Sequence, residues 1–124
     1  MSIKRIRESE EMYLETILLL HKKNPCVRAV DVCEELCYAK SSVSRGVNLL
    51  KNKGYIDIDH ATGNITFTDA GREKAENIYK RHRILTEVLM KVGAEHGVAE
   101  ENACRIEHVI SEDMMKIFEE FADK

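Results

Sequence analysis

The chain has 124 residues, of which 44% are apolar, and its formal net charge is -3 at pH 7. This length allows one compact core, or two small lobes that share a long helix, and it excludes a large multidomain enzyme. No apolar run approaches the ~20 residues of a membrane span, and the N-terminus MSIKRIRESEE lacks the apolar stretch of a signal peptide. We therefore expect a cytoplasmic protein with no membrane partner.

Charge is distributed unevenly along the chain. Residues 1–94 contain 16 Lys and Arg against 13 Asp and Glu, whereas residues 95–124 contain 3 against 9. The first part suits a polyanionic partner, and the acidic second part does not.

The four cysteines are Cys26, Cys33, Cys37 and Cys104. Because a reducing compartment disfavours disulfides, we interpret all of them as free thiols. Cys33 and Cys37 stand four residues apart, as a metal or redox pair can, but they lie in the apolar pattern that begins AVDVCEEL. We favour burial as small hydrophobic residues for this pair.

Three helices are predicted in the first half of the chain. Apolar residues recur at helical spacing over about 8–22, and an Asn-Pro pair ends that helix. A short helix is predicted over about 30–36, and the residues that it turns inward are Val30, Val32, Cys33 and Leu36. After a turn at 37–40, SSVSRGVNLLKNKG predicts a third helix with Ser41 as its N-cap and Gly54 as its stop.

The apolar period changes after Gly54. Residues 55–59 (YIDID) alternate apolar and polar side chains, 60–64 (HATGN) are typical of a turn, and 65–68 (ITFT) alternate again. This pattern predicts a β-hairpin. A hairpin that follows a helix-turn-helix is a wing.

A long helix is predicted after the hairpin, capped by Thr68 or Asp69 and reaching about residue 92. Its two dozen residues span about 36 Å, longer than a small lobe, so it can begin a second lobe. Two more helices are predicted over about 99–110 and 112–121, with Ser111 as a cap between them. The fold class is therefore mainly α, with a winged helix-turn-helix domain in residues 1–70 and a helical domain in residues 71–124.

Residues 38–54 are basic and contain no acidic side chain. The first residues of a recognition helix contact base edges in the major groove, where Arg can pair with guanine, and Lys attracts phosphates irrespective of sequence. The candidate DNA-binding residues are Lys40, Ser41, Ser42, Ser44, Arg45 and Lys51. Two alternatives remain, because these charges can simply solvate an amphipathic helix and winged helices also bind proteins.

The segment ACRIEHVI, residues 103–110, gathers three metal donors. If it is helical, Cys104, Glu107 and His108 stand at i, i+3 and i+4 and share one face. Met12 and Glu15, at i and i+3, share a face of the first helix in the same way. On residue types alone, the favoured interpretation is that Cys104 is a buried small residue and that Glu107 with His108 is a surface pair.

Three segments carry a family resemblance: SEEMYLETILLL at 9–20, RHRILTEVLMKVG at 81–93 and ACRIEHVIS at 103–111. Together with the helix-turn-helix and wing, they resemble the iron- and manganese-dependent repressors of bacteria, the diphtheria toxin repressor and manganese transport regulator family. The resemblance covers nearly the whole chain and looks like the two-domain form, which lacks the C-terminal SH3-like domain. It implies a metal-dependent repressor of metal-homeostasis genes that binds palindromic double-stranded DNA and acts on no small-molecule substrate.

The resemblance also implies a divalent-metal site shared by the first helix and the helices of a metal-binding and dimerisation domain. The implied ligands are Met12, Glu15, His82, Cys104, Glu107 and His108. Met12 with Cys104 resembles the iron-responsive branch and Glu15 the manganese branch, and we favour Fe(II) over Mn(II). At two positions linked to an ancillary metal site, this sequence has Thr86 in place of a carboxylate and Glu100 in place of an imidazole. The remaining histidines, His21, His60 and His96, show no partner pattern and are expected at the surface.

Apolar residues in the C-terminal helices are more numerous than these short helices can bury among themselves, which favours a homodimer. Two alternative functions remain open. The chain can be a winged-helix regulator of a non-metal signal, with a purely structural donor cluster. It can also be a small metalloenzyme, but C-x-x-E-H lacks the two histidines on one helix of zinc proteases, and no Ser/His/Asp set or glycine-rich phosphate loop is present.

Overall fold

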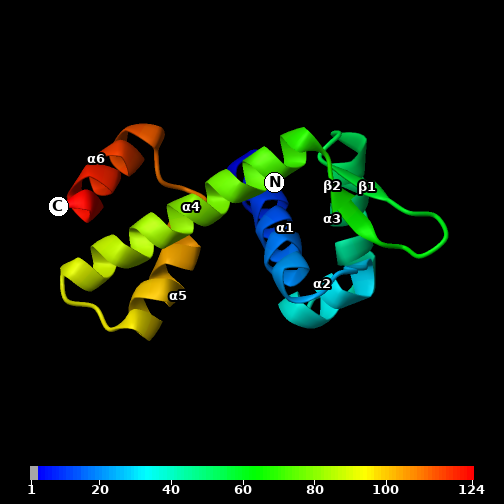
Figure 1. The fold of residues 1–124 in the computed structure, drawn as a ribbon, viewed down its shortest axis with the longest axis horizontal. Coiled ribbons are helices and arrows are strands. Elements are labelled where there is room, and N and C mark those ends of the chain that lie inside the picture. Colours follow the sequence, from blue (N-terminus) through cyan, green and yellow to red (C-terminus); the bar gives the residue numbers. More distant parts are fainter. Residues whose placement is uncertain (1–2) are drawn as a thin grey trace. The chain divides into compact units, whose positions relative to one another are not determined.

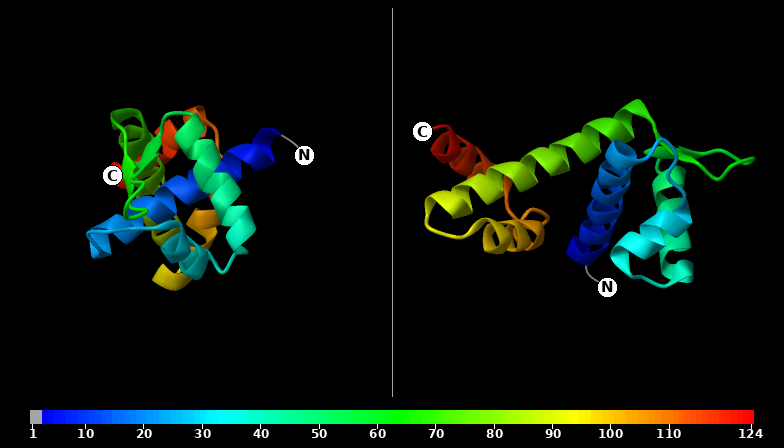
Figure 2. Two further views of the ribbon diagram at one scale, coloured as in Figure 1. Left: turned by 90° about the vertical axis from the view of Figure 1, so that its right-hand side faces the viewer. Right: turned by 60° about the horizontal axis from the view of Figure 1, so that its bottom comes forward.

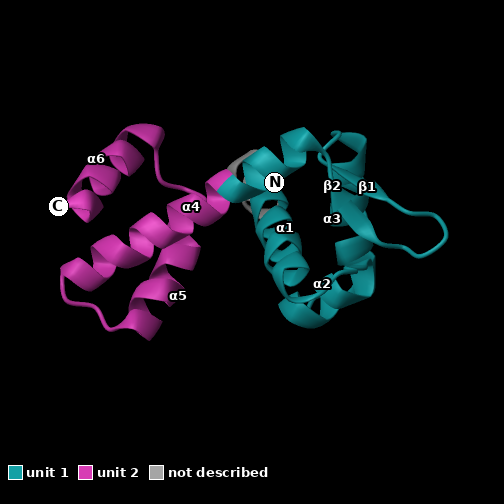
Figure 3. Ribbon diagram, in the orientation of Figure 1, with its two compact units in different colours: residues 1–76 teal, residues 77–124 magenta. Residues whose placement is uncertain are grey.

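The computed structural model describes the backbone of residues 3–124 and the side chains from Glu10 onwards. Within this range the elements are α1 (Ile3–Lys23), α2 (Ala29–Leu36), α3 (Lys40–Asn52), β1 (Ile56–Ile58), β2 (Ile65–Phe67), α4 (Asp69–Lys91), α5 (His96–Ile106) and α6 (Glu112–Asp123) (Figure 1). The chain divides into two compact units, residues 1–76 and 77–124 (Figure 3). The predicted fold class, a mainly helical chain that begins with a winged helix-turn-helix, is confirmed, whereas the exact domain boundary at residue 70 stays a prediction.

The core of unit 1 is built from apolar residues at helical spacing. α1 buries Tyr13, Leu14, Ile17 and Leu18, and α3 buries Val43, Val47 and Leu50. Burial of such a stripe is the main source of stability for short helices, because isolated helices of this length are marginal in water. α2 and α3 with the turn between them form the predicted helix-turn-helix.

The wing is an antiparallel pair in which Ile56 lies opposite Phe67 and Ile58 opposite Ile65. Its inner side chains, Ile56 and Ile65, are buried, and the alternate positions are exposed. Figure 2 shows the connecting loop extending away from α3 of the same unit. The predicted hairpin is therefore confirmed, with shorter strands.

Two contacts tie the base of the wing to the loop between α1 and α2. The Val27 amide donates to Asn64 Oδ1 at 2.9 Å, and the Ile65 amide donates to the Val27 carbonyl at 2.7 Å. These bonds satisfy the backbone groups of Val27 and the Ile65 amide, so the start of β2 is anchored to the loop between α1 and α2.

α4 begins with the predicted cap, because the Gly71 amide donates to Thr68 Oγ1 at 3.1 Å. The structure requires a glycine at position 71, in the first turn of α4. A Cβ at this position would lie 1.8 Å from the Tyr55 carbonyl oxygen. The close approach of α4 to Tyr55, which lies between α3 and β1, therefore depends on the missing side chain.

Unit 2 has a small core of Leu85, Ala103 and Met115, against which Ile106, Ile110 and Phe118 pack. Ser111 accepts from the Met114 amide at 3.2 Å, which confirms it as the N-cap of α6. At the other end of α6, Lys91 Nζ donates to the Phe121 and Ala122 carbonyls at 3.1 and 2.6 Å. The lysine of α4 thus closes the last turn of α6.

Several boundary predictions are wrong. α5 begins at His96 and ends at Ile106, not over 99–110, and Glu107 is its C-cap. The Val109 and Ile110 amides both donate to the Ile106 carbonyl, so the chain leaves the helix in a tight turn. α3 begins at Lys40 with Ala39 as its N-cap, so Ser41 lies inside the helix and caps nothing.

The inward face predicted for the short helix is also partly wrong. Val32 is fully buried, but Val30 is 51% exposed and Cys33 is half-buried. Cys37 is exposed, because it follows the last helical residue with φ +57° in the left-handed region, the conformation that ends a helix. Burial of Cys37 as a small hydrophobic residue is therefore excluded.

No helix among residues 3–124 combines the length and the apolar character that crossing a bilayer requires.

Candidate metal centre and nucleic-acid interface

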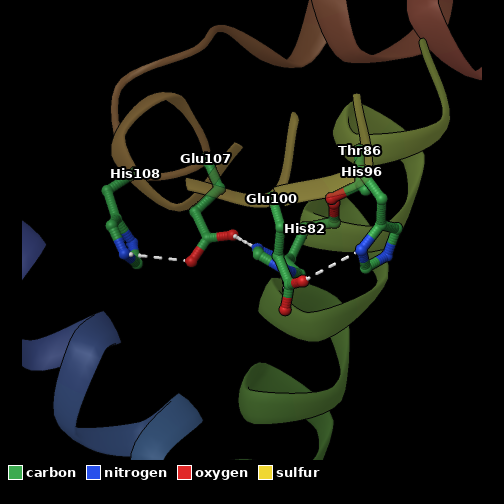
Figure 4. A network of polar contacts seen from close by, with 6 residues as sticks. All are labelled: His82, Thr86, His96, Glu100, Glu107 and His108. Atoms are coloured by element: carbon green, nitrogen blue, oxygen red, sulfur yellow. Dashed lines mark hydrogen bonds and ion pairs between the residues drawn. The ribbon is translucent and has the colours of Figure 1, made fainter. Parts of the chain in front are cut away.

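A buried carboxylate lies between two imidazoles in unit 2 (Figure 4). Glu107, 0% exposed, has one oxygen 2.7 Å from His82 Nδ1 and the other 3.2 Å from His108 Nε2. His82 comes from α4, whereas Glu107 and His108 follow the end of α5. An ionised carboxylate buried in this way requires hydrogen bonds or opposite charge, and the two ring nitrogens can supply either.

This arrangement has the chemistry of a divalent-metal site. Carboxylate and imidazole donors suit Mn, Fe, Co, Ni and Zn. A ring nitrogen that faces a carboxylate can carry a proton or, once deprotonated, share a cation with that carboxylate. His82, Glu107 and His108 therefore fit such an ion by donor type and by their mutual approach.

A second polar cluster adjoins the first through His82. Its Nε2 lies 4.0 Å from Glu100 Oε1, and Glu100 Oε2 lies 3.6 Å from His96 Nδ1 (Figure 4). These three side chains line a cavity of ≈ 360 Å³. Thr86 also lines this cavity, and its hydroxyl donates to the His82 carbonyl at 2.8 Å. The Thr86 hydroxyl is therefore bonded to the backbone of its own helix, α4.

His96 was expected to have no partner pattern, and this expectation is wrong. It is exposed, but it stands four residues before Glu100 on one face of α5. The i, i+4 spacing was visible in the sequence, and it was missed because α5 was predicted to begin after His96.

Cys104 lies in the last turn of α5 and is exposed, whereas Glu107, three residues later, is fully buried. Because α5 ends at Ile106, His108 lies beyond the helix, and the predicted common helical face does not extend to it. The assignment of Cys104 as a metal ligand stays a prediction.

Met12 and Glu15 belong to α1 in unit 1. Met12 is half-buried and its sulfur lies 3.6 Å from the Tyr38 hydroxyl, while Glu15 is buried. Both side chains project from one face of α1, as their spacing predicts. Their roles as ligands also stay predictions.

The recognition helix α3 presents most of its candidate DNA-binding residues to solvent. Lys40, Ser41, Arg45 and Lys51 are exposed, and Ser42 and Ser44 are half-buried. Asn48, which the sequence analysis did not select, is exposed on the face of Ser41 and Arg45 at i+7 and i+3. An amide at such a position can pair with adenine, and its helical spacing was the signal that could have identified it.

α1 supports the recognition helix through Tyr13. A Cβ on Gly46 of α3 would lie 2.2 Å from Tyr13 Cε2, so the ring occupies the place of that side chain. The Tyr13 hydroxyl donates to the Ser42 carbonyl at 3.5 Å. Burial, and then the neighbouring Tyr38, raise the pKa of Tyr13 above its ordinary value, so its hydroxyl keeps its proton at neutral pH.

His21 is a further correction. It is half-buried rather than a partnerless surface histidine, because its Nε2 lies 2.5 Å from the Ile65 carbonyl of the wing. Its ring also packs near Phe67, with centroids 6.2 Å apart. These partners lie more than forty residues away in the sequence, so no local pattern predicted them. His60, in contrast, is exposed as expected.

Two family models match the chain. Residues 5–63 match "Iron dependent repressor, N-terminal DNA binding domain", and residues 68–124 match "Iron dependent repressor, metal binding and dimerisation domain". An uncharacterised HTH-type transcriptional regulator of Methanocaldococcus jannaschii is 32% identical over 123 residues, which cover 94% of this chain and 98% of that protein. The HTH-type transcriptional regulator MntR of Geobacillus kaustophilus is 32% identical over 107 residues, 83% of this chain and 72% of that protein.

A solved structure has the same fold. The chain matches a manganese-dependent transcriptional repressor in complex with manganese with a TM-score of 0.82 at 23% identity. The match covers 92% of this chain and 52% of that one.

Proposed function

This chain belongs to the iron-dependent repressor family, and on that premise we propose that it represses genes of iron or manganese homeostasis. The family consists of metal-dependent transcriptional regulators with DNA-binding and dimerisation domains, not of enzymes. One observation carries the proposal: the buried carboxylate of Glu107 lies between the His82 and His108 imidazoles, in the half of the chain that matches the metal-binding domain. Metal is thus the signal, and DNA is the target.

The proposed ligands are Met12, Glu15, His82, Cys104, Glu107 and His108. The contacts of Glu107 with the two imidazoles support the three ligands of unit 2. The inclusion of Met12 and Glu15 follows from the family resemblance of α1. Cys104, whose thiol is exposed and would be a softer donor, is included on the family resemblance.

We favour Fe(II) over Mn(II) as the cellular activator. A thioether and a thiolate move the preference of a site towards softer ions, whereas carboxylate donors alone suit manganese. Removal of the thiol by Cys104→Ala should therefore lower the ratio of Fe(II) to Mn(II) affinity, measured under anaerobic conditions. An unchanged ratio would exclude Cys104 as the residue that sets the preference.

The proposed DNA contacts are made by Lys40, Ser41, Ser42, Ser44, Arg45 and Lys51. The exposure of Lys40, Ser41, Arg45 and Lys51 on α3, together with the absence of acidic residues over 38–54, supports this assignment. A two-fold dimer would present two such helices to the major groove, which requires a palindromic operator with half-sites about one helical turn apart. Because phosphate contacts dominate affinity, binding should weaken steeply as salt rises.

Metal dependence requires an equilibrium between two arrangements that differ in affinity for the ion. A bound cation supplies positive charge that several carboxylates can share. In the proposed active arrangement, Met12 and Glu15 of α1 act as ligands together with Glu107 and His108. Tyr13 seats α1 against Gly46, so a fixed α1 holds the recognition helix in one position. In a dimer, this fixes the separation of the two recognition helices.

The test begins with metal-free protein and a duplex selected from a randomised pool by the Mn(II)-loaded protein. We expect Mn(II), or Fe(II) without oxygen, to raise the affinity for this duplex at least about tenfold, a coupling of ordinary size. Glu107→Gln and His108→Ala should abolish the increase. The control Glu101→Gln, an exposed residue paired with Arg105 on α5, should retain it. Equal affinity with and without metal would instead favour a winged-helix regulator of a non-metal signal.

A further inference from the structure

Tyr38 links a proposed metal ligand to the recognition helix within unit 1. It lies between α2 and α3, two residues before Lys40, the first residue of α3. Its hydroxyl lies 3.6 Å from the Met12 sulfur of α1, within the range of a hydrogen bond to sulfur. Its side chain is also 43% exposed. One phenol therefore contacts a ligand candidate while it remains accessible to solvent beside the DNA-binding residues.

The ring of Tyr38 packs against the ring of Tyr13. The two rings meet edge to face at 90°, with centroids 6.4 Å apart. Tyr13 is itself held against Gly46 and the Ser42 carbonyl of α3. Tyr38 therefore contacts two consecutive residues of α1, because its hydroxyl meets the Met12 sulfur and its ring meets the Tyr13 ring.

The Tyr38 contact competes with metal binding by Met12. A thioether sulfur is a weak acceptor with two lone pairs, and donation of one pair to a metal ion withdraws electron density from the other, so its bond to a hydroxyl weakens further. A tyrosine hydroxyl that loses this partner near a DNA-binding surface has another acceptor available, because tyrosine commonly donates to phosphate oxygens.

We propose that Tyr38 is a positioning residue that reports the state of Met12 to the DNA interface. With no metal, its hydroxyl is bonded to the Met12 sulfur; when Met12 becomes a ligand, the hydroxyl is released and donates to a phosphate beside the N-terminus of α3. This inference rests on the proposed role of Met12 in metal binding. It adds a residue that the set of candidate DNA contacts lacked.

Fluorine NMR of protein labelled with ring-fluorinated tyrosine tests the release directly. The chain has four tyrosines, and Tyr38→Phe identifies the resonance of Tyr38. Saturation with Zn(II), a diamagnetic probe, should shift this resonance and leave that of Tyr55 unchanged. In Met12→Leu, which keeps an apolar side chain but offers no electron pair, the Tyr38 resonance should no longer respond to Zn(II). A Tyr38 resonance that is unmoved in the parent protein, or that moves equally in Met12→Leu, overturns the proposal.

Calorimetric titration with Zn(II) separates this inference from the proposed function. Loss of Zn(II) binding in Glu107→Gln, together with an unmoved Tyr38 resonance, rejects only the coupling through Tyr38. Zn(II) binding that does not depend on Glu107 rejects the metal site itself.

Affinity for the selected duplex supplies the functional readout. In Tyr38→Phe, the increase in affinity caused by Mn(II) should be smaller by about tenfold or more, the effect of one lost hydrogen bond to a charged group. The affinity of this variant for Mn(II) should not fall, because the Met12 sulfur no longer accepts a hydrogen bond from the Tyr38 hydroxyl. Tyr55→Phe, which removes a hydroxyl contacted by Lys74 elsewhere in unit 1, is the matched control and should leave both affinities unchanged. An unchanged Mn(II) effect on DNA binding in Tyr38→Phe contradicts the proposal.

Discussion

The interiors of the two units differ in kind. The large side chains that are fully buried in unit 1 are apolar: Leu14, Ile17, Val27, Val32, Val43, Leu50, Ile56 and Ile65. Those of unit 2 are Ile78, Leu85 and the carboxylate Glu107, while Val92, Val98 and Ile117 are at least half exposed. Unit 1 therefore stabilises itself by apolar burial. Both units expose some apolar side chains, since Val30 and Leu49 of unit 1 are 51% and 56% exposed. Only unit 2 has a carboxylate, that of Glu107, among its fully buried large side chains, so its stability depends more on what binds to that group.

The largest expected effect concerns the packing of unit 1. Gly71→Ala places a Cβ 1.8 Å from the Tyr55 carbonyl oxygen, which cannot rotate away. We expect a loss of about 3 kcal/mol in the free energy of unfolding, at the upper end for overpacking, measured by urea denaturation. The control Gly97→Ala meets only the end of the flexible Glu95 side chain at 3.1 Å and should change stability little. A tolerated Gly71→Ala would show that unit 1 is less rigid than its packing indicates.

The next effect concerns the buried charge of unit 2. Mn(II) at about 100 times its Kd should stabilise the protein by about 2.7 kcal/mol, because a ligand of the folded state alone shifts the unfolding equilibrium by mass action. Thermal denaturation with and without Mn(II) measures this effect. Glu107→Gln should abolish it, and Glu101→Gln should preserve it. Equal stabilisation of both variants would mean that the ion binds elsewhere.

A smaller effect is expected at the exposed apolar surface of unit 2. Ile117→Lys should weaken the homodimer by about 1.5–2 kcal/mol if this side chain, 55% exposed in the monomer, is buried between two copies. Sedimentation velocity over a range of concentrations measures the change. Val30→Lys alters a side chain of similar exposure, 51%, in unit 1 and should leave association unchanged. If Val30→Lys weakens association and Ile117→Lys does not, the dimer surface lies in unit 1 and the prediction is wrong.

The smallest effect concerns the wing. The Ala61 amide and the Thr62 hydroxyl donate to the Asp59 carboxylate and lower the pKa of Asp59 below its ordinary value. Because its folded pKa is the lower one, Asp59 contributes stability above its unfolded pKa, and this contribution is lost as pH falls through the folded pKa. In Asp59→Asn the difference from the parent protein should therefore be present at neutral pH and vanish in acid. Urea denaturation across that range measures it, and a difference independent of pH would exclude the charge as its cause.

Local patterns predicted the fold well, because its elements are set by neighbours in the sequence. The alternation in YIDID and ITFT located the wing, and Thr68 and Ser111 were recognised as caps. The end of α5 was missed because Glu107 is engaged by His82, 25 residues away, which no window of sequence contains. The contacts of Tyr13 with Gly46 and of Tyr38 with Met12 were not predicted for the same reason, because the partners lie far apart in the sequence.

The candidate metal site was predicted by a different route. Spacing alone left Cys104, Glu107 and His108 open to ordinary structural roles, and the family resemblance selected them. The structure adds that Glu107 contacts two other proposed ligands, His82 and His108, through its two carboxylate oxygens. At the proposed DNA interface, Asn48 and Tyr38 were not predicted, because the pattern that indicated DNA contacts consists of basic residues and serines.

The close contact between Gly46 and the Tyr13 ring limits which residues of α3 can change as the DNA sequence preference of this protein evolves. Any larger residue there would collide with the Tyr13 ring, so that side of the recognition helix is closed to variation unless α1 changes with it. Ser41, Arg45 and Asn48 are exposed on the same helix, and Ser44 is half-buried. New binding preferences should therefore arise by substitution along that strip, and directed libraries for altered operators should be restricted to it.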